Sequence, residues 1–134
     1  MFVNLPAEDP DPNHMCARLL RHMHGTRMAA DGWQEECSTL LVRLSFKQGA
    51  SCPNLFYHDG KSVRCSVHGD DFTSVGPKSS LERFEDAVAK SYEVSVGPRL
   101  GPAKADAKEA RALNQVVMWC DDGSVEYEAD PRQA

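Results

Sequence analysis

The stretch SVRCSVHGDDFTSV, residues 62–75, predicts a β-hairpin with two adjacent aspartates, Asp70 and Asp71, at its tip. Apolar and polar residues alternate before the Gly-Asp step, as in a half-buried strand, and a second short strand-like run follows it. Two neighbouring carboxylates repel each other unless one is protonated or both bind a cation. Gly69 supplies the freedom for both to approach one ion, and Mg²⁺ prefers hard oxygen ligands. The hairpin tip is therefore a candidate metal site.

Upstream of the hairpin, apolar residues recur with the period of a helix. They lie at i, i+4, i+7, i+8 and i+11, which predicts a helix with one buried face. We expect this helix to end near Phe46–Gly49, where Gly49 can adopt a left-handed terminating conformation. In residues 16–23 the apolar spacing also fits a helix, but the segment is short enough to be a strand. The residues of the long helix's buried face are Trp33, Cys37, Leu40, Leu41 and Leu44.

Short strands and a second helix surround the aspartates. The strand-like runs Asn54–Tyr57 and Ser62–His68 flank an Asp-Gly step, which favours a tight hairpin. Downstream, Ser79 and Glu82 form a capping box, which predicts a helix running to about Ser91.

The remaining segments complete an α+β pattern. The runs 92–96, 112–119 and 125–128 are strand-like, and residues 97–110 are interpreted as an exposed polar connection. Residues 1–14, with several prolines and acidic residues, predict an extended arm. This order predicts an antiparallel sheet with helices on one face.

Composition limits the class of protein. The chain has 134 residues, enough for one small domain, with 41% apolar and 26% charged residues. A net charge of −5 argues against a free-standing nucleic-acid binder, and the basic cluster is limited to Arg18, Arg21 and Arg27 with nearby histidines. No apolar run approaches the ~20 residues of a membrane span. The five irregularly spaced cysteines predict reduced thiols and an intracellular, non-secreted protein, cytoplasmic or nuclear.

The segment before the first predicted helix resembles a known family. MHGTRMAADGW at 23–33 is similar to the LYGLKQAPRAW segment of Ty1/copia-type retrotransposon reverse transcriptases. Gly25, Ala29 and Trp33 match identically, and Arg27 stands where the family has a basic residue.

Two later stretches resemble the same family, in the same order. Phe46 followed by CPNLFYHDG at 52–60 is similar to the family's F…DPSLFYK stretch, and HGDDF at 68–72 stands where the family has its YVDD motif. The resemblance covers nearly the whole chain. The identical residues of the second stretch are Pro53, Leu55 and Phe56.

The resemblance implies a polymerase palm that performs RNA-directed DNA synthesis within a retrotransposon polyprotein. It implies that Asp70 binds catalytic Mg²⁺ in a two-metal site and that Asp71 supports it. Gly25 and Arg27 would lie near the incoming nucleotide or the template strand. The implied partners are an RNA/DNA template–primer and deoxynucleotides, with no membrane. The resemblance also makes residues 16–23 a strand, and we adopt that interpretation.

On this interpretation the chain is a single partial reverse transcriptase domain, truncated at both ends. Asp130-Pro131 would begin a helix that the chain does not complete. The expected parts are an extended arm at 1–14, a palm core with the Asp-Asp hairpin at 15–96, an exposed connection at 97–110, and a C-terminal hairpin with the start of a truncated helix at 111–134.

The chain also departs from the family pattern. His68 replaces the usual tyrosine, either as a packing substitution or as a group that tunes the metal site. The family carries another metal-binding aspartate upstream of the segment that residues 3–10 resemble, and Met1 begins after that point. Asp9 and Asp11 lie in a proline-broken polar arm and are poor replacements. We therefore expect the fragment to be inactive alone.

Two other hypotheses remain. In the first, the chain is a degenerate or co-opted, non-catalytic fragment of a transposable element that acts as a small binding module. Alternatively, it is an unrelated metal-dependent hydrolase that uses Asp70, Asp71 and His68.

Overall fold

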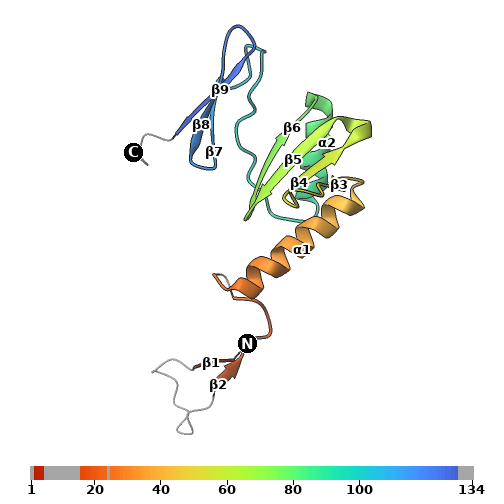
Figure 1. Ribbon diagram of the computed structural model, residues 1–134, viewed down its shortest axis with the longest axis vertical. Helices are drawn as coiled ribbons and strands as arrows, with labels where there is room; N and C mark the ends of the chain where they lie inside the picture. Colours follow the sequence, from red (N-terminus) through yellow and green to blue (C-terminus); the bar gives the residue numbers. More distant parts are fainter. Residues whose placement is uncertain (1, 5–15, 24, 130–134) are drawn as a thin grey trace. The chain divides into compact units, whose positions relative to one another are not determined.

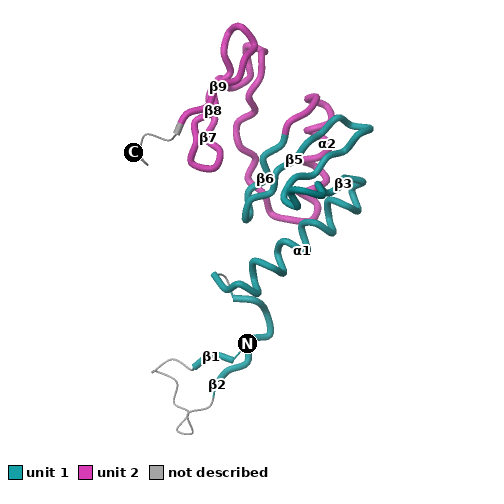
Figure 2. Tube along the Cα trace, in the orientation of Figure 1, with its two compact units in different colours: residues 1–74 teal, residues 75–134 magenta. Residues whose placement is uncertain are grey.

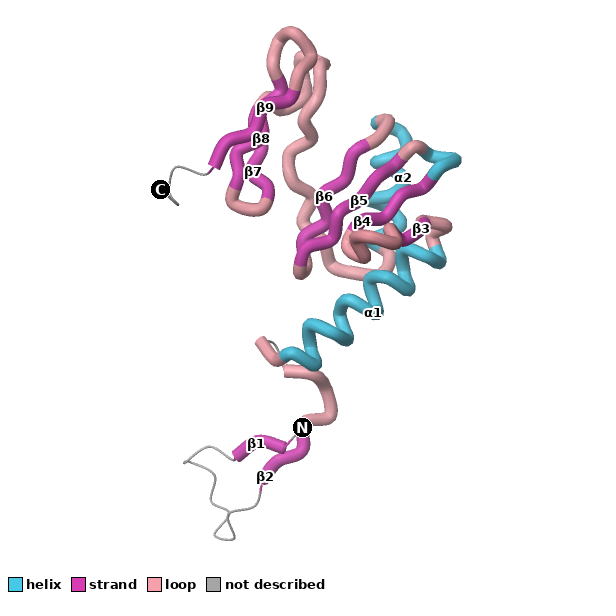
Figure 3. Tube along the Cα trace, in the orientation of Figure 1, coloured by secondary structure: helices cyan, strands magenta, loops and turns pink. Residues whose placement is uncertain are grey.

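The computed structural model describes residues 2–4, 16–23 and 25–129. The chain divides into two compact units, Met1–Ser74 and Val75–Ala134 (Figure 2). Each unit contains a helix and antiparallel strands (Figure 3). The α+β prediction is therefore confirmed. In the described part of the chain, neither helix has the length and apolar content needed to cross a membrane.

Two short strands pair at the N-terminal end of the first unit. β1 (Phe2–Asn4) lies antiparallel to β2 (Cys16–Arg18) (Figure 1). The strand interpretation of residues 16–23 is thus confirmed for Cys16–Arg18 only. The rest of the predicted arm at 1–14 lies outside the described residues, and so does the predicted helix start at Asp130-Pro131.

The long helix α1 (Arg27–Arg43) forms where the apolar period predicted it. Its N-cap is Thr26, whose side chain accepts a hydrogen bond from the Ala29 N–H at 3.3 Å. Three residues of the predicted apolar face are fully buried, and Trp33 is half-buried. The buried residues are Cys37, Leu40 and Leu41.

The end of α1 differs from the prediction. The helix ends at Arg43, and Ser45, not Gly49, adopts the left-handed conformation, with φ 69°. The Ser45 N–H donates to the Val42 carbonyl and the Phe46 N–H to the Leu41 carbonyl, each at 2.9 Å. These two bonds form a Schellman motif. The side chain of Phe46 is buried, and its burial favours the early end.

Gly49 has a different role from the predicted one. A Cβ at this position would lie 2.7 Å from the Cys52 carbonyl oxygen. The glycine therefore permits a close approach of the backbone between β3 and β4, rather than a left-handed helix end.

A four-stranded sheet follows α1, with the order β3 (Lys47–Gln48), β4 (Leu55–His58), β5 (Val63–His68) and β6 (Asp71–Val75). β4 and β5 pair antiparallel and confirm the hairpin predicted around the Asp-Gly step, and a 3₁₀ turn at Asp59–Lys61 joins them. Alternate residues of β5 are buried, as the sequence pattern predicted. With the buried residues of α1, they form the core of the first unit. The buried sheet residues are Phe56, Val63, Cys65 and Val67.

In the second unit, α2 (Lys78–Ala89) buries Phe84 and Val88. Pro77 occupies the N-cap position without a side-chain hydrogen bond. The predicted capping box at Ser79 is therefore wrong, because Ser79 already lies inside the first helical turn.

No strand forms at the predicted segment 92–96. Side-chain ion pairs hold the segment that follows it. Arg99 donates to Glu82 at 3.2 Å and to Glu85 at 2.9 Å, which ties this segment to α2.

The C-terminal strands form a three-stranded antiparallel meander. The strands are β7 (Glu109–Ala112), β8 (Gln115–Trp119) and β9 (Val125–Ala129). The predicted strand 112–119 is interrupted because Leu113 and Asn114 have φ of 51° and 62°, the pattern of a type I′ turn. The connection predicted for 97–110 therefore ends earlier, where β7 begins.

Candidate functional site

The hairpin that carries Asp70 and Asp71 has a two-residue loop. β5 ends at His68 and β6 begins at Asp71, so Gly69 and Asp70 form the turn. Gly69 has φ +59°, whereas Asp70 is not among the described residues with positive φ. A positive φ at the first loop position alone is the pattern of a type II′ turn. The structure thus brings the two predicted metal ligands together at the hairpin tip, and both are exposed.

Asp70 and Asp71 differ from Asp59, the acidic residue of the preceding turn, in whether a cationic side chain pairs with them. Lys47 Nζ donates to Asp59 Oδ2 at 2.7 Å, and this hydrogen bond lowers the pKa of Asp59. Within the described ranges, neither Asp70 nor Asp71 has a cationic partner within 4.0 Å. Their adjacent carboxylates are therefore available to an external cation.

The chain's other adjacent pair, Asp121 and Asp122, serves as an internal comparison. The backbone N–H and the hydroxyl of Ser124 donate to Asp122 Oδ1 at 2.9 and 2.6 Å. These bonds lower the pKa of Asp122 and hold its carboxylate within its own turn. This pair is therefore an ordinary polar turn.

A tryptophan on α1 contacts the turn of the candidate site. Trp33 Nε1 donates a hydrogen bond to the Gly69 carbonyl oxygen at 2.6 Å. The two residues are 36 positions apart, so the bond joins the helix to the hairpin tip. The sequence predicted Trp33 only as part of the buried helix face. No local sequence signal identifies this contact, because the two residues are far apart in the chain.

A small groove of about 180 Å³ borders this hydrogen bond. Residues of α1, of the sheet and of the turn line the groove. The Gly69 residue, whose carbonyl accepts from Trp33, is one of them. The lining includes Ala30, Trp33 and Cys37 from the helix, Phe56 and Val67 from the sheet, and Gly69 from the turn.

The predicted nucleotide- or template-contacting residues lie at the start of α1. Gly25 has φ +81° and precedes the N-cap, while Arg27 is the first helical residue. The Arg27 side chain is exposed, and Asp31 lies 3.9 Å away. Arg27 is roughly 9 Å along the helix axis from Trp33, at 1.5 Å per residue. The structure therefore places Arg27 on the element that contacts the hairpin, without direct contact to Asp70.

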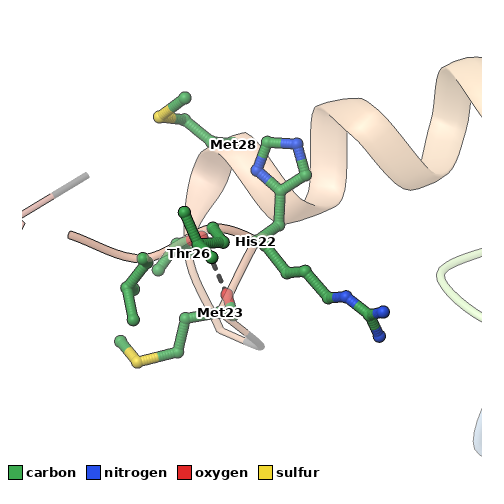
Figure 4. A pocket seen from close by; sticks show the side chains of 7 residues that line it. His22, Met23, Thr26 and Met28 are labelled. Atoms are coloured by element: carbon green, nitrogen blue, oxygen red, sulfur yellow. Dashed lines mark hydrogen bonds between the residues drawn. The ribbon is translucent and has the colours of Figure 1, made fainter.

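A second hollow, of about 140 Å³, lies beside the N-terminal end of α1 (Figure 4). Thr26 Oγ1 donates to the Met23 carbonyl at 2.8 Å and closes the turn that precedes the helix. His22 packs on the helix, because a Cβ at Gly32 would lie 3.3 Å from the imidazole Nε2. Of the residues that the structure describes, Arg21 lines this hollow and no carboxylate does.

The chemistry of the hairpin fits part of a magnesium site. Asp70 and Asp71 supply hard oxygen ligands, and Mg²⁺ is usually held by one or two carboxylates together with substrate phosphates. Among the described residues, no group of three His, Cys, Asp or Glu side chains is placed to hold a metal ion.

Comparisons with protein-family models, with curated proteins and with solved structures found no match.

Proposed function

We propose that this chain supplies the Asp-Asp hairpin of an RNA-directed DNA polymerase of the Ty1/copia type, within a palm-like domain. One observation carries the proposal: Asp70 and Asp71 are exposed, lack a cationic partner among the described residues, and lie on a turn that Trp33 contacts from α1. The ordered sequence resemblances around Trp33 and the hairpin support the choice of family.

In this role the two carboxylates hold Mg²⁺ together with the phosphates of a deoxynucleotide. Bound metal in such a site supplies activation of the attacking hydroxyl and stabilisation of the leaving pyrophosphate. Arg27 is exposed, its nearest ion-pair partner among the described residues is Asp31 at 3.9 Å, and it supplies a cation for phosphate or template. Gly25 shapes the turn that presents it.

The proposal includes inactivity of the isolated chain. Two metals in line need ligands from two strands, and among the described residues no group of three His, Cys, Asp or Glu side chains is placed to hold a metal ion. Primer extension on an RNA template with Mg²⁺ tests this part, and we expect no incorporation. Robust incorporation that Asp70→Asn abolishes would overturn the inactivity and leave the polymerase assignment intact.

The metal-site part is tested by electron paramagnetic resonance of Mn²⁺ titrated with the full chain and a deoxynucleoside triphosphate. We expect the protein to deplete free Mn²⁺, and the variant Asp70→Asn/Asp71→Asn to lose this binding. The matched variant Asp121→Asn/Asp122→Asn should retain it, because it removes the same charge from an ordinary turn. Equal binding by the two double variants would contradict the proposal.

A non-catalytic binding module is the second candidate function. The net charge of −5 favours it, because phosphate binding needs clustered cations. This candidate predicts a cooperative fold in which no aspartate pair binds Mn²⁺ with the nucleotide.

A further inference from the structure

The Gly69–Asp70 turn has two accessible forms that differ by a flip of its central peptide. In the type II′ form φ is positive at Gly69 only, and in the type I′ form it is positive at both loop residues. Glycine tolerates both forms, and aspartate is one of the few other residues that enter the left-handed region readily. Glycine at the first loop position favours the type II′ form, and a contact from outside the hairpin can strengthen that preference.

The oxygen that Trp33 contacts belongs to that central peptide. In a two-residue hairpin the Gly69 carbonyl makes no ladder hydrogen bond, because the ladder pairs the residues on either side of the loop. The indole donates to this oxygen at 2.6 Å, and the structure shows the form with positive φ at Gly69 alone. A flipped peptide would turn the same carbonyl away from the indole.

We propose that Trp33 is a positioning residue that locks the Gly69–Asp70 peptide in the type II′ orientation through its indole N–H. The peptide unit is planar, so fixing the Gly69 carbonyl fixes the plane that contains the Asp70 nitrogen and Cα. The flip would reverse the sign of φ at Asp70 and turn its backbone N–H to the opposite face of the turn, while the Cα–Cβ direction of Asp70 would stay nearly the same. The lock therefore sets which face of the turn the Asp70 N–H occupies beside the two carboxylates.

The consequence for metal binding rests on the proposed function, whereas the lock itself does not. Hydrogen-bonding groups around a metal site that do not themselves bind the ion typically change metal affinity 10–100-fold when they are removed. We expect about tenfold weaker Mn²⁺ binding at the hairpin when the indole donor is lost. A net hydrogen bond of ordinary strength shifts the ratio of the two turn forms by about fivefold.

Nuclear magnetic resonance of the labelled full chain tests the lock without metal. In the type II′ form a Gly69 Hα lies close to the Asp70 amide proton and gives a strong nuclear Overhauser effect, which weakens in the type I′ form. We expect this effect to weaken in Trp33→Phe, which keeps an aromatic ring but lacks the donor. The matched control is Trp119→Phe, which removes the other indole of the chain.

A tryptophan isostere at position 33, with sulfur in place of the indole N–H, keeps the full ring volume and decides the result if Trp33→Phe does not fold. An unchanged Gly69–Asp70 Overhauser effect in the isostere would overturn the lock.

Mn²⁺ titration distinguishes failure of the proposed function from failure of the lock. Absence of binding in the unmodified chain would contradict the proposed function, while the Overhauser effect would still decide on the lock. Unchanged Mn²⁺ affinity in the isostere would overturn the positioning role.

Discussion

Leu41 and Val42 are neighbours on α1 with opposite environments. Leu41 is 0% exposed and Val42 is 55% exposed. We predict that Leu41→Ala lowers the free energy of unfolding by about 2–5 kcal/mol, because it leaves a cavity in the core. Val42→Ala should change it by less than about 0.5 kcal/mol. Urea denaturation followed by circular dichroism measures both. Equal losses would show that α1 does not bury the predicted face.

The Lys47–Asp59 pair gives a pH dependence at the residue scale. The hydrogen bond from Lys47 lowers the pKa of Asp59 from its ordinary 3.8. A depressed carboxyl pKa stabilises the fold above the unfolded value, and this contribution is lost as pH falls through the folded value. The same bond raises the pKa of Lys47 from 10.5, so its contribution is lost as pH rises through the folded value. The pair therefore stabilises between these limits.

We predict that Asp59→Asn reduces the loss of urea resistance between pH 6 and pH 3, taken as about two units above and one below the ordinary aspartate value. Because both groups are exposed, the effect is small, and high salt should screen it. Measurement of urea midpoints at the two pH values checks the prediction. An unchanged pH dependence in the variant would show that the Lys47–Asp59 pair does not contribute to the pH dependence of stability.

At the same scale, the two aspartates of the candidate site could be predicted from sequence, because a Gly-Asp-Asp step between two apolar strands is a local signal. The contact from Trp33 could not. It joins residues 36 positions apart and depends on how α1 packs on the sheet. Local periodicity assigns Trp33 to a helix face and contains no information on its partner.

Among the elements, the helices could be predicted because their buried residues follow a period of 3.6. Their ends could not be predicted as well, because Ser45 and Pro77 replace the expected glycine and serine caps. Strand β7 was missed because Glu109–Ala112 alternates charged residues with alanine and carries little apolar signal. Pairing with β8 makes this segment a strand, and such pairing is not a local property.

The Schellman motif at the end of α1 leads to an element-scale prediction. A left-handed conformation costs a non-glycine residue about 1–2 kcal/mol, and Ser45 has φ 69°. Ser45→Gly should therefore stabilise the protein by about 1 kcal/mol. Glu36→Gly, at an exposed position within the helix, should destabilise it by about 0.5 kcal/mol, because glycine is the poorer helix former. Thermal unfolding compares the two, and stabilisation by both or by neither would contradict the assigned helix end.

At the scale of the whole molecule, the five free cysteines report on packing. Cys37 and Cys65 are each 1% exposed, and burial raises the pKa of the Cys65 thiol. Cys16 and Cys52 are exposed. We predict that iodoacetamide modifies the exposed pair rapidly and the buried pair only in denaturing urea, as mass spectrometry of peptides would show. Rapid modification of Cys37 or Cys65 in the native protein would contradict the core of the first unit.

We propose that the Asp70–Asp71 hairpin holds Mg²⁺ as part of a polymerase metal site. The most direct measurement is paramagnetic line broadening in ¹⁵N spectra of the full chain as Mn²⁺ and a deoxynucleoside triphosphate are added. We predict that the amide signals of Gly69, Asp70 and Asp71 broaden first, and that Asp70→Asn prevents this. Broadening of the Asp121–Asp122 turn to the same extent, or no selective broadening of the Asp70–Asp71 hairpin, would contradict the claim.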